Sequence, residues 1–139
     1  MTMKENAHLQ WQLEQAGRVH GHICPSLFYG VCLARRIKEW LSKRKLLQPL
    51  ELILEGKSVC IRDGVRSVLS EYALPLRLES SSQCALTVIC QDQQRYRVSI
   101  SPLVRLRINE LNQSLPLEKF KQVGVAYLQS LSERELFGE

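Results

Sequence analysis

Five consecutive residues near the start of the chain concentrate side chains that bind metals. His20, His22 and Cys24 place two imidazoles and a thiol at alternate positions. Neutral imidazole nitrogen and thiolate sulfur are the ligands that zinc and other late first-row divalent metals prefer. Gly21, between the histidines, permits backbone conformations that other residues resist, so that the flanking side chains can turn toward one point. The segment therefore predicts a metal site.

Cys24 has a second possible role, as a nucleophile. It directly precedes Pro25, and proline suits the first position of a helix. Free backbone amides and the helix dipole at a helix start favour a thiolate, so a lowered pKa is expected for Cys24. A small thiol-dependent enzyme is therefore an alternative to a protein that only holds a metal.

A second group of the same kind follows at Cys60 and Asp63. Cys60 stands at the start of a predicted helix, and Asp63, one turn later, faces the same way. Asp63 is expected to orient a histidine, to bind metal or to act as a general base; helix-start electrostatics is the alternative. His20, Cys24 and Cys60 are the predicted ligands. Whether His22 joins them stays open, because the sequence does not fix its direction in the connector.

The three other cysteines, Cys32, Cys84 and Cys90, are predicted to serve packing. Cys84 and Cys90, six residues apart on one predicted strand, are too distant for a disulfide. No apolar run is long enough to cross a bilayer, and the first residues are too polar for a signal peptide, so a cytoplasmic protein is expected. Five cysteines in that compartment indicate thiols, metal ligands or catalysis rather than disulfides.

Composition favours an ordinary globular protein. The 139 residues are 45% hydrophobic and 24% charged, which is enough for one domain with a real core. The 19 Lys and Arg against 14 Asp and Glu give a net charge of +5. The basic residues are scattered, without an RNA-binding or helix-turn-helix signature, so a nucleic-acid-binding module is the least favoured function. The charge is interpreted as a solvated surface or a dock for an acidic partner.

Helices and a small sheet must position these residues. Gly17 is predicted to end the first helix in a left-handed conformation, with a connector following. Gly30 and Gly64 are small positions on helices, which permits close contact. Periodicity and turn residues predict helices over 6–17, 25–43 and 59–72 and from 102 and 116 onward, and strands over 50–55, 76–79, 84–90 and 95–101, the last two forming a hairpin. Residues 1–139 are thus expected to form one α+β domain with a mixed sheet of four to five strands, flanking helices and a helical C-terminus.

The run from His20 to Leu27, His-Gly-His-Ile-Cys-Pro-Ser-Leu, resembles the signature His-Gly-His-x-Cys-Pro-Gly-Leu of the FmdE-like family, which is named after formylmethanofuran dehydrogenase. Cys60 and Asp63 match its second landmark, Cys-x-x-Asp. Residues 97–102 loosely match a third landmark, an arginine-valine strand that ends near a proline. The sequence differs at Ser26, where the family usually has glycine. It also lacks the family's Gly-Cys-Thr segment and the pair of Cys-x-x-Cys motifs that form a zinc finger in some relatives.

This resemblance implies an α+β core, often dimeric, with a site for zinc or another divalent transition metal at His20, His22, Cys24, Cys60 and Asp63. It also implies a link to molybdenum or tungsten formylmethanofuran or formate dehydrogenase-type redox metabolism in anaerobes. An accessory or subunit-like protein is therefore expected, with a homodimer and a redox enzyme as partners. The alternative is a small enzyme that uses Cys24 or a metal-bound water, with Asp63 as base.

Overall fold

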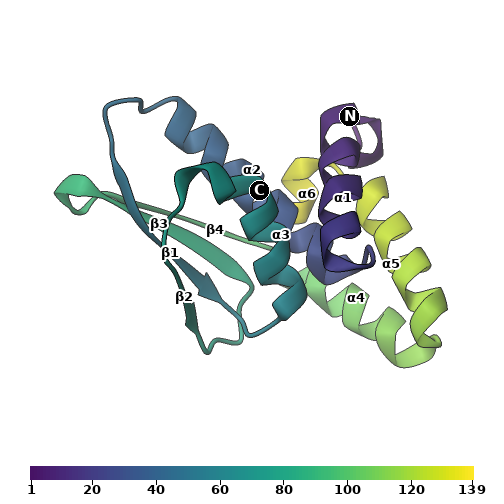
Figure 1. The fold of residues 1–139 in the computed structure, drawn as a ribbon. Coiled ribbons are helices and arrows are strands. Elements are labelled where there is room, and N and C mark those ends of the chain that lie inside the picture. Colours follow the sequence, from purple (N-terminus) through teal and green to yellow (C-terminus); the bar gives the residue numbers. More distant parts are fainter.

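One mixed sheet of four strands forms one side of the molecule (Figure 1). The computed structural model describes residues 1–139. The strand order is β2-β1-β3-β4: β1 (Pro49–Glu55) pairs in parallel with β2 (Leu76–Glu79) and antiparallel with β3 (Ala85–Cys90), and β4 (Arg95–Ser99) completes the β3–β4 hairpin. The predicted α+β class, mixed sheet and hairpin are confirmed.

Helices form the other side of the molecule. The two helices α2 (Pro25–Ser42) and α3 (Val59–Leu69) lie between the sheet and the other helices in Figure 1. The outer group comprises α1 (Ala7–His20), α4 (Pro102–Ser114), α5 (Leu117–Ser130) and α6 (Glu133–Phe137). Single turns of 3-10 helix occur at Met3–Glu5, Ser70–Tyr72 and Gln91–Gln93. None of the helices combines the length and apolarity needed to cross a membrane.

Because side chains alternate along each strand, the sheet has one apolar face, and its other face carries charged side chains. Leu52 and Leu54 of β1 belong to the same buried cluster as Leu86 and Val88 of β3. On the other face, the Glu55 carboxylate accepts a hydrogen bond of 2.7 Å from Nε of Arg97. The core therefore lies between the sheet and α2 and α3.

The first helix is longer than predicted. Asn6 caps its start as expected, its Oδ1 accepting a 3.0 Å hydrogen bond from the Leu9 amide. Gly17, predicted to end the helix, lies inside it, and a Cβ there would come within 2.5 Å of Ile23. Gly21 is the left-handed residue, with φ of +108°. The predicted connector over 18–23 was therefore wrong for its first three residues, which belong to the helix. Gly17 is small because it packs against Ile23, and Gly21 supplies the left-handed conformation that ends the helix.

Two further differences lie in the later helices. The predicted third helix was too long, because α3 ends at Leu69 and a 3-10 turn follows. The short helix α6 was missed, although Ser132 and Glu135 form a capping box, which is a signal readable in the sequence. Leu131, which follows α5, is only 8% exposed and belongs to the core.

Candidate metal centre

Four side chains place their ligand atoms in one group. The imidazole nitrogens of His20 and His22 and the sulfurs of Cys24 and Cys60 all lie within 4.8 Å of one another. Nε2 of His20 is 3.1 Å from Sγ of Cys60, and Nε2 of His22 is 4.0 Å from the same sulfur. Ligand atoms on one tetrahedral zinc lie roughly 3.3 to 3.8 Å apart. The two nitrogens and two sulfurs therefore fit a zinc-like ion in both type and spacing.

The candidate ligands come from three segments that meet at their ends. His20 is the last residue of α1, and the left-handed Gly21 reverses the chain immediately after it. Cys24 is the N-cap of α2, and its sulfur accepts a hydrogen bond of 3.5 Å from the Leu27 amide. Cys60 lies in the first turn of α3. One short reversal thus supplies three ligands, and a distant helix start supplies the fourth.

A close contact between α2 and α3 holds the two thiols together. A Cβ on Gly30 would lie 2.2 Å from the Ile61 carbonyl oxygen, and one on Gly64 would lie 2.6 Å from the Leu27 carbonyl oxygen. These are backbone atoms, which cannot turn aside as a flexible side chain can. The two glycines therefore allow α2 and α3 to approach closely near Cys24 and Cys60, as their small size predicted.

Asp63 lies in direct hydrogen-bond contact with His20. Its Oδ2 lies 2.6 Å from Nδ1 of His20, and the His20 side chain is only 9% exposed against 32% for Asp63. A carboxylate only accepts hydrogen bonds, so Nδ1 carries the proton and Nε2 keeps its lone pair toward Cys60. This is the carboxylate–histidine arrangement that commonly supports a metal-binding imidazole.

Burial dominates the protonation of the metal-free site. It raises the pKa of Cys24 to about 11, which outweighs the opposing hydrogen bond from the Leu27 amide. The expected lowering of this pKa by the helix start was therefore wrong. Burial lowers the pKa of His22, as does the positive charge of Lys121, so neutral imidazole is favoured there. In the metal-free protein Cys24 is a protonated thiol, a poor nucleophile at neutral pH.

All five residues predicted for the site lie in or against this group, His22 included, with His22 the member most open to solvent. The remaining cysteines Cys32, Cys84 and Cys90 are buried free thiols outside it. Sequence reasoning missed Lys121 of α5, whose side chain is 21% exposed and forms a 3.2 Å ion pair with Glu118. No local signal could have identified Lys121, because only the folded chain brings its charge near His22.

Comparison with known proteins identifies a family that matches most of the chain. A family model described as "FmdE, Molybdenum formylmethanofuran dehydrogenase operon" matches residues 19–137 of the 139-residue chain. The match begins one residue before His20 and includes the four grouped ligands and Asp63. Among curated proteins, none matched the sequence.

Proposed function

Because this chain belongs to the FmdE family, we propose that it is a metal-binding member of that family, with zinc or a similar divalent transition metal as its cofactor. His20, His22, Cys24 and Cys60 would hold the ion, and Asp63 would keep His20 in the required tautomer. The bound ion would neutralise two thiolates and tie the end of α1 to the starts of α2 and α3. The observation that carries the proposal is the convergence of four nitrogen and sulfur ligand atoms within 4.8 Å.

An accessory or subunit-like role suits this site better than catalysis. Sets of four protein ligands are typical of structural zinc, whereas catalytic zinc usually keeps one position open. Cys24 is buried and its raised pKa keeps it protonated, which disfavours a thiol nucleophile. The Asp63 carboxylate is already bonded to His20, which favours an orienting role over that of a general base.

One observation favours the enzyme alternative. His22 is the most exposed of the four residues and its nitrogen lies 4.0 Å from Sγ of Cys60, farther than that of His20. His20, Cys24 and Cys60 without it would form a three-ligand set with one open position. The variant His22→Ala distinguishes the two arrangements. A large loss of zinc affinity supports the four-ligand site, and unchanged affinity supports the open one.

For the partner, we infer an enzyme of molybdenum or tungsten formylmethanofuran or formate dehydrogenase-type redox metabolism. The description of the matching family names the operon of the molybdenum enzyme, and the net charge of +5 suits an acidic surface. Binding of the purified protein to such an enzyme should weaken as salt increases. Absence of binding at low salt would reject this partner while leaving the metal site intact.

Elemental analysis of the purified protein tests the site itself. About one zinc-like ion per chain is expected, with loss of the metal in Cys24→Ala and Cys60→Ala. The matched control is Cys90→Ala, which makes the same substitution at a buried cysteine outside the group. In the cobalt-substituted protein, thiolate-to-metal charge-transfer absorption should disappear with the same two variants. Equal metal content in all three variants would reject the proposal.

A further inference from the structure

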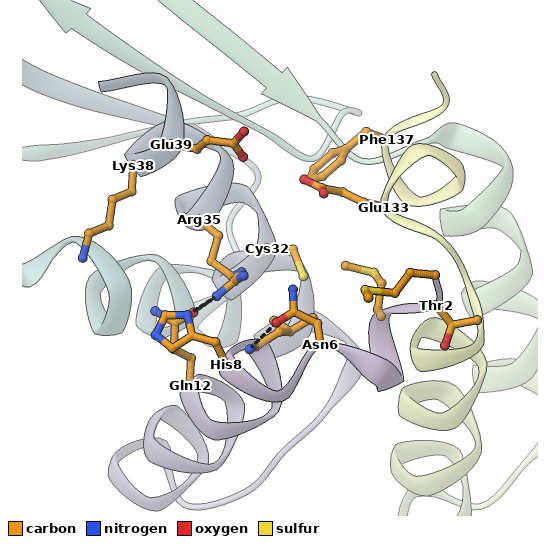
Figure 2. Close-up of a pocket in the computed structure, with 13 residues that line it drawn as sticks. Thr2, Asn6, His8, Gln12, Cys32, Arg35, Lys38, Glu39, Glu133 and Phe137 are labelled. Atoms are coloured by element: carbon orange, nitrogen blue, oxygen red, sulfur yellow. Dashed lines mark hydrogen bonds between the residues drawn. The ribbon is translucent and has the colours of Figure 1, made fainter. Parts of the chain in front are cut away.

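A cavity of about 400 Å³ lies at the opposite end of α1 from the metal centre. It lies between the amino-terminal part of α1, the carboxyl-terminal half of α2 and the short helix α6 (Figure 2). His8 on its wall is twelve residues before His20, which corresponds to about 18 Å along the helix axis. The cavity is therefore separate from the metal centre, although the same two helices build both.

The cavity has an apolar wall. The side chains that form it are all at most 9% exposed: Met3, Leu9, Cys32 and Phe137. Burial raises the pKa of Cys32 well above that of a free thiol, so Cys32 adds no negative charge. Small-molecule sites typically enclose roughly 300 to 1,000 Å³ with mostly apolar walls and a few placed polar groups. The size and the apolar wall of this cavity meet that description.

Arg35 is the polar group of the cavity that is held in a fixed position. Its Nη1 donates to Nδ1 of His8 at 2.9 Å and to Oε1 of Gln12, and Figure 2 shows the side chain reaching from α2 toward these two residues. Arginine only donates, so Nδ1 of His8 must present a lone pair, and both partners are neutral acceptors. Nε and Nη2 of Arg35 form no hydrogen bond within the protein.

The other charged side chains of the wall have opposite charges beside them. Lys38 pairs with Glu71. Glu39 lies 3.3 Å from Nζ of Lys43, and Glu133 lies 3.0 Å from Nε of Arg36. Among the charged side chains that line the cavity, Arg35 alone has no carboxylate partner. A partly buried guanidinium with free donors and no counterion is a ready partner for an anion.

We propose that this cavity binds a small organic carboxylate. The carboxylate would accept hydrogen bonds from the free donors of Arg35, and the apolar body would lie against Leu9 and Phe137. A carboxylate is favoured over a phosphate because a carboxylate carries a single negative charge. The carboxylates of Glu39 and Glu133, which also line the cavity, would oppose a second charge.

Hexanoate tests the proposal in the wild-type protein, observed through the methyl NMR signals of Met3 and Leu9. Hexan-1-ol lacks the charge, acetate lacks the apolar body, and inorganic phosphate is the competing anion class. Saturable binding of hexanoate is expected, with the other three at least about tenfold weaker, which is the size of one charged hydrogen-bonding interaction. Equal binding of hexanol and hexanoate, stronger binding of phosphate, or no saturable hexanoate binding would each overturn the proposal.

Variants locate the binding. Arg35→Gln is expected to weaken hexanoate at least about tenfold, and Arg35→Lys to give a smaller loss because it keeps the charge without the planar fork. Arg107→Gln, an exposed arginine on α4 outside the cavity, should bind as the wild type does. Undiminished hexanoate binding by Arg35→Gln would overturn the assignment. If that variant does not fold, the four small molecules still decide the matter on the wild type.

Discussion

Gly30 of α2 and Gly64 of α3 lie in backbone contact: a Cβ built on Gly30 would be 3.1 Å from the Cα atom of Gly64. The start of α2 carries Cys24 and the start of α3 carries Cys60, so this contact determines how near the two thiols come. Packing between two helices is thereby linked to the geometry of the candidate metal centre.

Substituting either glycine should affect stability and metal binding together. Gly30→Ala and Gly64→Ala are expected to lower the free energy of unfolding by about 1 to 3 kcal/mol, because the new methyl groups meet backbone atoms. Zinc affinity should fall as α2 and α3 move apart. Denaturant unfolding and a chelator competition measure the two effects. Arg66→Ala, on the exposed side of α3, is the control. Wild-type stability in both glycine variants would contradict the close contact.

Removing the charge of Asp63 should weaken zinc binding without unfolding the protein. Asp63→Asn is expected to lower the affinity about 10- to 100-fold, the usual effect of losing the partner of a metal-binding histidine. Asp92→Asn makes the same chemical change at an exposed turn and should have no effect. Competition with a chromophoric chelator measures both variants. Equal affinities would mean that Asp63 does not orient His20.

Zinc affinity should rise with pH. The pKa of Cys24 in the metal-free protein is raised to about 11, so between pH 6 and 8 the thiol is protonated and must lose its proton to bind metal. One released proton corresponds to about a tenfold gain in affinity per pH unit. Burial lowers the pKa of His22 and favours its neutral imidazole, so this residue should contribute little to the proton release. Competition titrations across this range, with calorimetry in buffers of different ionisation enthalpy, measure the proton count, and a flat profile would exclude Cys24 as a ligand.

Alkylation should distinguish Cys60 from the other thiols. Cys60 is half-buried, whereas the other four cysteines are buried and have raised pKa values. Iodoacetamide is therefore expected to modify Cys60 first in the native metal-free protein, and zinc should suppress this reaction. Peptide mass spectrometry over a time course gives the order. Modification of Cys60 at the same rate with and without zinc would show that the ion binds elsewhere.

Removing the metal should destabilise the protein without unfolding it. Free zinc at about 100 times its dissociation constant would add about 2.7 kcal/mol to the free energy of unfolding. The main core, with Phe28, Leu54 and Leu86 fully buried, does not depend on the ion. Unfolding curves with zinc and with excess chelator should thus differ for the wild type and coincide for Cys60→Ser. Complete unfolding on chelation would mean that the metal itself maintains the fold.

Short-range patterns in the sequence were enough to predict most elements and the chemistry of the candidate ligands. Alternation and turn residues located β1 and the β3–β4 hairpin, because side-chain direction in a strand follows directly from position. The two imidazoles and two thiols were identified by residue type together with their spacing and their positions near predicted helix starts. The end of α1 was misplaced because two glycines, Gly17 and Gly21, give the same local signal, and only contact with Ile23 separates their roles.

Distances between segments far apart in the chain were decided only by the tertiary structure. His20 and Asp63 are 43 residues apart in the sequence and 2.6 Å apart in space. The pKa of Cys24 depends on burial by the whole fold, which outweighs the local helix start. Only the folded structure shows that Arg35 lacks a carboxylate partner, whereas the charged side chains of Lys38, Glu39 and Glu133 form ion pairs. Residue type thus determined which chemistry is possible, and packing determined which groups meet and in which protonation state.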